Sequence, residues 1–106
     1  MCIRDRAKTL LGVACGWLVA DELHITVVAV DPSVRRRGHG KQLLSALLQR
    51  ARQQGVIHAT LEVANHNSAA IALYASSGFQ SAGTRTKYYS DGSDALIQWC
   101  RINPLN

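Results

Sequence analysis

The 106-residue sequence lacks any apolar run long enough to cross a bilayer as a helix, which takes about 20 residues. Its three cysteines, Cys2, Cys15 and Cys100, are odd in number and lack the spacing of metal ligands. We therefore expect buried free thiols of a cytoplasmic protein. The four histidines include no pair three or four residues apart, which argues against a metal site.

Aromatic residues are scarce, and none of the six lies among the cationic residues 35–41. The formal charge of +5 comes from twelve Lys and Arg against seven Asp and Glu. Proteins that bind nucleic acid usually present a broad basic stripe with aromatic stacking platforms. We therefore expect a small anionic ligand, with no nucleic acid and no membrane as partner. A basic nucleic-acid-binding module stays as the alternative.

The first six residues, MCIRDR, fit neither a signal peptide nor the pattern of a strand or helix. They resemble translated sequencing-adapter sequence. We interpret residues 1–6 as a foreign-looking leader, residues 7–102 as one domain and residues 103–106 as a tail. A single domain suits the length of the chain.

Hydrophobic periodicity predicts the element order ββαβαββ. The helical stripe that follows the cationic segment ends before Gly55, where a left-handed C-cap is expected. Strand, helix and strand in succession form a central βαβ unit, so we expect an α/β (α+β) fold with a mixed, mainly antiparallel sheet. The predicted elements are two strands within residues 10–30, a helix over 40–54, a strand over 56–64, a helix over 68–77, and strands over 83–89 and 95–101.

The cationic segment VRRRGHGK joins a predicted strand to the first predicted helix. Gly38 and Gly40 let the backbone approach a ligand without a Cβ in the way. The first N–H groups of the helix have no intrahelical acceptor, and with the helix dipole they suit a phosphate. Neither a P-loop nor the dinucleotide-binding fingerprint is present. A tight turn with a solvated basic face would explain the segment equally well.

The wider pattern V-x-V-D-P-x-x-R-x-x-G-x-G-K-x-L-L, followed by L-E-V-x-x-x-N-x-x-A-x-x-L-Y-x-x-x-G-F, resembles the acyl-CoA-binding core of GNAT-family N-acetyltransferases. The resemblance spans about residues 11–101. It implies a GNAT-like fold, acetyl-CoA as co-substrate and no metal. Arg35 would anchor the loop or face solvent. In the family, this loop holds the pyrophosphate through backbone amides, and the matching residues here are Arg36, Arg37, Gly38, His39, Gly40 and Lys41.

The same resemblance implies how the thioester is held. Val28, Ala29 and Val30 match a strand that bulges, so that the pantetheine arm lies along it and a backbone N–H polarises the carbonyl. These three residues would also serve as ordinary core. Asn67 matches a cofactor contact, and it is equally placed to cap the helix that follows.

Two residues match the catalytic positions of the family. Glu62 would be the general base, and its alternative is to pair with an arginine across the sheet. Tyr74 would assist the leaving thiolate, or else simply pack in the core. Full proton transfer from a phenol to a thiolate is uphill by roughly 2 kcal/mol, so we expect a hydrogen bond instead. Tyr88 and Tyr89 would line the peptide entrance, or be exposed strand residues.

Within the family, LEVANHNSAAIALYASSGF and TKYYSDGSDA resemble bacterial enzymes that acetylate the α-amino group of a ribosomal-protein alanine. The resemblance implies direct attack by a protein N-terminus in a ternary complex. The alternatives are acetylation of a lysine or a small amine, and an inactive CoA-binding fragment. GNAT domains usually carry a strand, two helices and another strand ahead of the segment that starts here near Leu10. We therefore expect a truncated chain with exposed apolar surface and weak acceptor binding.

Overall fold

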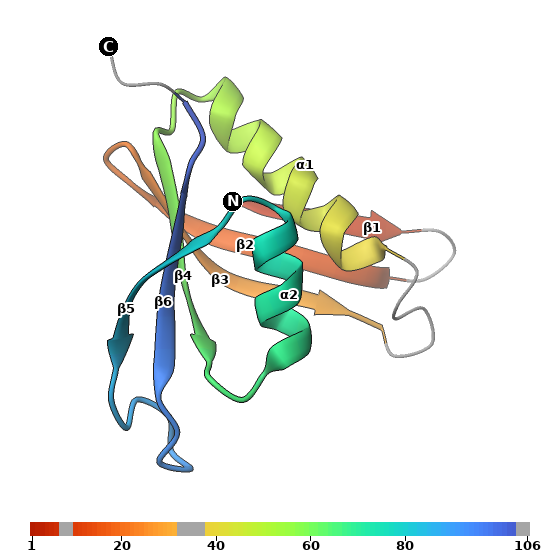
Figure 1. Ribbon diagram of the computed structural model, residues 1–106. Helices are drawn as coiled ribbons and strands as arrows, with labels where there is room; N and C mark the ends of the chain where they lie inside the picture. Colours follow the sequence, from red (N-terminus) through yellow and green to blue (C-terminus); the bar gives the residue numbers. More distant parts are fainter. Residues whose placement is uncertain (7–9, 32–37, 104–106) are drawn as a thin grey trace.

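The computed structural model describes residues 1–6, 10–31 and 38–103 (Figure 1). Six strands form one sheet in the order β1-β2-β3-β4-β6-β5. Among the described strands, only β3 and β4 pair in parallel, which confirms a mixed, mainly antiparallel sheet. The elements are β1 (Cys2–Arg6), β2 (Leu10–Val19), β3 (Glu22–Val30), α1 (His39–Gln53), β4 (His58–Ala64), α2 (Ser68–Ser76), β5 (Gln80–Arg85) and β6 (Ala95–Arg101).

Both helices cover the same face of the sheet, and the core lies between them and that face (Figure 1). The largest fully buried side chains come from β3, α1 and β4; they are Leu23, Leu44, Leu47 and Leu61. The α1 stripe is buried as its spacing predicts, and Gly55 follows the helix with a φ of 82°. Only glycine adopts that left-handed conformation without strain.

The opposite face of the sheet carries exposed apolar side chains. Strand register places Trp17, Val19 and Val27 on this face, and their exposed fractions are 70%, 66% and 43%. We call it the open face, because no helix of the described chain lies over it (Figure 1). The expected exposure of apolar surface is therefore found here.

The N-terminal residues are part of the sheet, which corrects the prediction that they have no strand character. β1 pairs antiparallel with β2, and the two chain segments exchange backbone hydrogen bonds of 2.9 Å between Met1 and Gly16. An edge strand needs backbone partners on one side only, so its side-chain pattern carries little signal.

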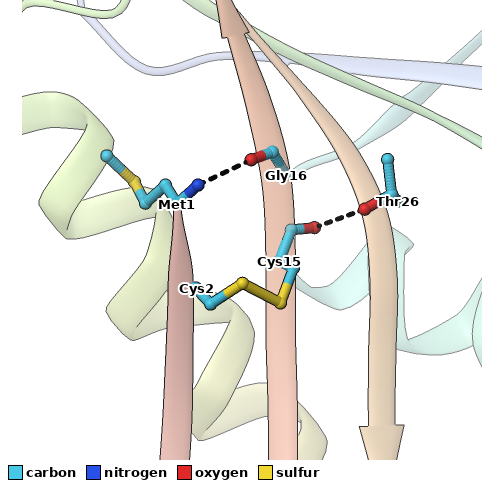
Figure 2. The surroundings of a disulfide bond; sticks show 5 residues. All are labelled: Met1, Cys2, Cys15, Gly16 and Thr26. Carbon is cyan, nitrogen blue, oxygen red and sulfur yellow. Dashed lines mark hydrogen bonds between the residues drawn. A yellow bond between two sulfur atoms is a disulfide. The ribbon is translucent and has the colours of Figure 1, made fainter.

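Two of the three cysteines are not free thiols. Cys2 lies opposite Cys15 in the register of β1 and β2, and their sulfur atoms form a disulfide (Figure 2). The prediction of free thiols is wrong for this pair, since it took no account of a strand at residues 2–6. Cys100 is free and buried as predicted, and burial raises the pKa of its thiol to about 11.

The strand predicted over residues 83–89 lies earlier in the chain, as β5. Lys87 adopts a positive φ of 49°, which is incompatible with a continuing strand, and its N–H donates to Asp94 Oδ1 at 2.9 Å. The following residues therefore form the loop between β5 and β6. The element order differs from the predicted one by the added β1.

Candidate active site

The parallel strands β3 and β4 run side by side for only part of their length. Their register ends at the pair of His24 and Thr60, although β3 continues to Val30 and β4 to Ala64 (Figure 1). On its other side, β3 has a register shift against β2 that leaves Thr26 without a paired residue. The divergence of strands that the family resemblance implies is therefore present, and the bulge of β3 lies at Thr26, two residues before the predicted Val28.

A cavity of about 660 Å³ lies where β3, the start of α1 and the start of α2 meet. Of the ten residues predicted to bind the cofactor, Arg36 and Arg37 lie outside the described residues. The other eight all line this cavity, and they are Val28, Ala29, Val30, Gly38, His39, Gly40, Lys41 and Asn67. The strand and helix start of residues 28–41 thus meet the start of α2, which lies more than 25 residues further along the chain.

The start of α1, from Gly38 to Lys41, forms part of the wall of this cavity. The first helical hydrogen bond runs from the N–H of Gln42 to the carbonyl of Gly38, so the amides of Gly40 and Lys41 precede it. Gly38 has a φ of 80°, which turns the chain sharply into the helix. Helix N-termini of this kind bind anions through their amides and the helix dipole.

Asn67 has a structural role as well as a place in the cavity wall. Its Oδ1 accepts a hydrogen bond of 3.2 Å from the N–H of Ala70, which confirms the predicted N-cap of α2. The cap holds the first turn of the helix that carries Tyr74.

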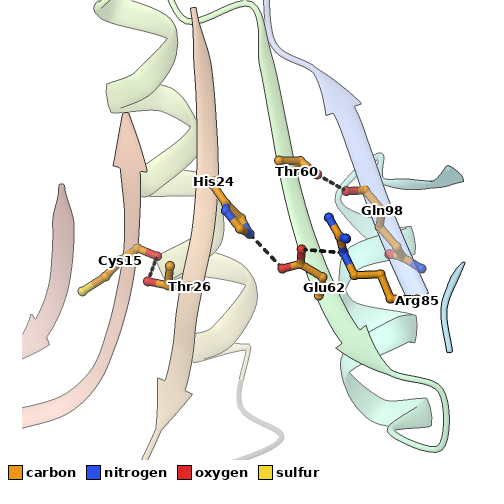
Figure 3. A network of polar contacts seen from close by, with 7 residues as sticks. All are labelled: Cys15, His24, Thr26, Thr60, Glu62, Arg85 and Gln98. Carbon is orange, nitrogen blue, oxygen red and sulfur yellow. Dashed lines mark hydrogen bonds and ion pairs between the residues drawn. The ribbon is translucent and has the colours of Figure 1, made fainter. Parts of the chain in front are cut away.

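Glu62 lies on the open face, with its neighbours Leu61 and Val63 buried on the other side. Its Oε2 is 2.8 Å from His24 Nε2 and its Oε1 is 3.4 Å from Arg85 Nε (Figure 3). The predicted alternative, an arginine across the sheet, is thus present. It does not exclude a role as base, because each carboxylate oxygen accepts more than one hydrogen bond.

Tyr74 is buried on α2, and its ring meets the ring of Phe79 edge to face, with centroids 5.8 Å apart. Burial and, to a smaller extent, the charge of Tyr89 raise the pKa of Tyr74. The phenol therefore keeps its proton at neutral pH and is available as a hydrogen-bond donor. Packing and hydrogen-bond donation are compatible at this position.

Tyr88 and Tyr89 lie in the loop between β5 and β6, so their interpretation as strand residues is wrong. Their ring centroids are 5.1 Å apart, and the loop closes through a hydrogen bond from the Tyr89 N–H to the Ser93 carbonyl. Burial raises the pKa of Tyr89, and the charges of Tyr88 and Glu62 add to this effect.

His24 and Arg85 were not among the predicted site residues. One signal in the sequence pointed to His24, which alternates with the apolar Leu23 and Ile25 and so had to face away from the core. Its neighbour across the sheet depends on strand register, which a single sequence does not reveal. Arg85 lies two strands away from Glu62, beyond β6.

The described ranges contain no group of three His, Cys, Asp or Glu side chains able to hold a metal ion. In the same ranges, no helix is long and apolar enough to span a membrane.

The fold and the site together define a class of protein. Residues 1–79 match the acetyltransferase (GNAT) family, and the chain belongs to this family. The predicted family and the predicted GNAT-like fold are therefore confirmed.

Particular members of the family are closely similar to the chain. Ribosomal protein bS18-alanine N-acetyltransferase of Salmonella typhimurium is 46% identical over 83 residues, which are 76% of this chain and 56% of that protein. N-alpha-acetyltransferase RimI of Mycobacterium tuberculosis is 47% identical over 75 residues, which are 70% and 46% of the two chains. The chain thus spans about half the length of these relatives.

A solved structure gives the same result. The crystal structure of the ribosomal-protein-S18-alanine N-acetyltransferase from Escherichia coli matches with a TM-score of 0.92 at 35% identity. The match covers 100% of this chain and 71% of that one.

Proposed function

We propose that this chain carries the catalytic core of an N-acetyltransferase that acetylates the α-amino group of a protein N-terminus. The observation that carries the proposal is the single cavity lined by all eight described residues of the predicted cofactor site. It lies where β3 and β4 diverge, and Glu62 follows the point of divergence on β4. The similarity to ribosomal-protein-alanine acetyltransferases favours an alanine N-terminus as the acceptor.

Acetyl-CoA would supply the activated acetyl group as a thioester. The amides of Gly40 and Lys41 and the Lys41 ammonium would hold its pyrophosphate, together with the predicted Arg36 and Arg37. The backbone from Val28 to Val30, which lies beyond the last register pair of β3 and β4, would hydrogen-bond the pantetheine arm as a neighbouring strand does. Lining the cavity from the side of α2, Asn67 would complete the site.

The chemistry needs one proton acceptor and one hydrogen-bond donor. The α-amino nitrogen attacks the thioester carbon, a C–N bond forms, and the C–S bond breaks. Glu62 takes the proton that the nitrogen loses, directly or through a water molecule. An α-amino group has a pKa of about 8, so a modest base is sufficient near neutral pH. Tyr74 donates a hydrogen bond to the departing sulfur, and Tyr88 and Tyr89 guide the peptide.

A panel of acceptors tests the proposal. The chain is mixed with acetyl-CoA and a short peptide that begins with alanine, and released thiol is followed. The matched peptides have a blocked N-terminus with an internal lysine, or a different first residue, and a small amine completes the panel. We expect turnover with the alanine peptide at millimolar concentration and none with the blocked peptide. Faster turnover with the lysine or the small amine would reject the α-amino acceptor.

The cavity itself makes a prediction about Gly40. A Cβ at this position would lie 3.4 Å from Leu73 Cδ2 and 3.7 Å from Val30 Cγ2, so the branched side chain of Gly40→Val must extend into the cavity. We expect Gly40→Val to weaken acetyl-CoA binding about tenfold, which is about 1.4 kcal/mol, as measured by calorimetric titration.

The matched control is Ala46→Val, because it adds the same branched side chain to an exposed position of the same helix. Ala46→Val is expected to bind acetyl-CoA as the wild type does. An unchanged dissociation constant in folded Gly40→Val would place the cofactor outside this cavity.

A further inference from the structure

The carboxylate of Glu62 is held from two sides. His24 approaches from β3 at 2.8 Å, and Arg85 approaches from β5 at 3.4 Å, so that the carboxylate lies between them (Figure 3). The Glu62 side chain is only 16% exposed, which makes these contacts a large part of its polar environment. Burying a carboxylate costs free energy unless hydrogen-bond donors replace its contacts with water.

The two partners lie in different directions. His24 belongs to the last register pair before β3 and β4 diverge, and Glu62 lies two residues beyond its counterpart Thr60. The contact between His24 and Glu62 therefore spans the start of the gap between the strands. Arg85 lies on the far side of β4, beyond β6, so by itself it would draw the carboxylate away from that gap.

The contact also defines the state of the imidazole. An ionised carboxylate only accepts hydrogen bonds, so a Glu62 that acts as a base requires the tautomer in which His24 Nε2 carries the proton. At 2.8 Å, this is a short hydrogen bond of the charge-assisted kind. The longer contact with Arg85, whose side chain is 55% exposed, constrains the carboxylate less.

Packing does not explain a histidine at this position. The His24 side chain is 42% exposed, and its neighbour in register on β2 is the exposed Trp17. A side chain with this exposure adds little to the core, whereas its ring nitrogen makes a defined contact with Glu62.

We propose that His24 is a positioning residue, whose Nε2–H holds the Glu62 carboxylate toward the gap between β3 and β4 and so aims it at the acceptor amine. The proposal rests on the proposed function, in which Glu62 takes the proton of the amine. His24 acts through Glu62 and does not touch the reacting atoms. Its contribution is the orientation of a base, and orientation alone strongly affects the rate of a bound reaction.

The test compares two substitutions of His24. Leucine removes the donor, whereas glutamine keeps an N–H group at a similar reach from the backbone. We expect His24→Leu to lower kcat about tenfold, with KM for acetyl-CoA and peptide unchanged, because the base loses the donor that orients it. A tenfold loss corresponds to about 1.4 kcal/mol. We expect His24→Gln to retain kcat within about threefold. His58→Leu makes the same replacement at another histidine of the open face, and it should leave kcat unchanged.

A double variant separates positioning from an independent role. If His24 acts through Glu62, His24→Leu should have no further effect in a Glu62→Gln background. An additional tenfold loss in that background, or wild-type kcat in the His24→Leu variant, would overturn the proposal.

Nuclear magnetic resonance separates failure of this inference from failure of the proposed function. The ¹⁵N shifts of the His24 ring should show protonated Nε2 in the wild type and should change in Glu62→Ala, whether or not the chain is active. Unchanged shifts would mean that the contact is absent, which rejects the positioning role of His24 and leaves the proposed function standing. A contact that forms in a chain without acetyl transfer to any acceptor rejects the proposed function, and the positioning role with it.

Discussion

Replacement of Glu62 by glutamine is expected to lower kcat for acetyl transfer by about two to four orders of magnitude. The amide has the shape of the carboxylate and still accepts a hydrogen bond from His24, but it cannot take the proton of the acceptor amine. Its side chain is on the open face of the sheet, away from the core, so the fold should persist. Release of CoA thiol with the alanine peptide measures the effect.

The matched control is Glu22→Gln, because Glu22 is the exposed glutamate of the strand next to β4. That variant loses the same charge and should keep the wild-type rate. Calorimetric titration of Glu62→Gln should show unchanged acetyl-CoA binding, since Glu62 is not in the wall of the cavity. A rate for Glu62→Gln within about threefold of the wild type would mean that another group, or bulk water, takes the proton.

The cavity could be anticipated because its residues match a family motif that is recognisable along the sequence. The side-chain pattern and the two glycines of residues 28–41 are visible without knowledge of the rest of the fold. Asn67 precedes a short helix and has the residue type of an N-cap, which the structure confirms. Each of these signals depends on neighbours in the chain, and the βαβ connection then brings the segments together.

The environment of Glu62 could not be anticipated in the same way. Alternation along β4 predicted that Glu62 faces away from Leu61, and it does. The distance of 2.8 Å between His24 Nε2 and Glu62 Oε2 follows from the parallel register of β3 and β4. These two strands are separated in the sequence by α1. A shift of one residue would have turned His24 to the other face.

The incorrect predictions for β1 and β5, the two edge strands of the sheet, have the same origin. β1 joins the sheet through backbone hydrogen bonds and a disulfide partner that lies 13 residues away. β5 is short because the positive φ of Lys87 turns the chain, and a lysine is an unusual residue for that conformation. Edge strands depend on pairing and on turn geometry more than on a buried side-chain pattern, so their limits are poorly encoded in periodicity.

Leu47→Ala is expected to destabilise the protein by about 3 kcal/mol, within the range of about 2–5 kcal/mol for truncation of a fully buried leucine. Leu47 lies in the middle of α1 with no exposed surface, and the cavity left behind would border the sheet. Urea denaturation followed by circular dichroism measures the loss as a lower midpoint with an unchanged slope.

The expected loss is a large part of the total free energy of unfolding, because this free energy is only about 5–15 kcal/mol for single domains. It should be especially visible here, since the core lies on one face of the sheet while Trp17 and Val19 remain exposed on the other. Gln49→Ala, at an exposed position of the same helix, is the matched control and should change stability by less than about 0.5 kcal/mol. Should Leu47→Ala cost no more than this control, the contact of α1 with the sheet would not be the main source of stability, and the cavity that α1 helps to form would lack a rigid wall.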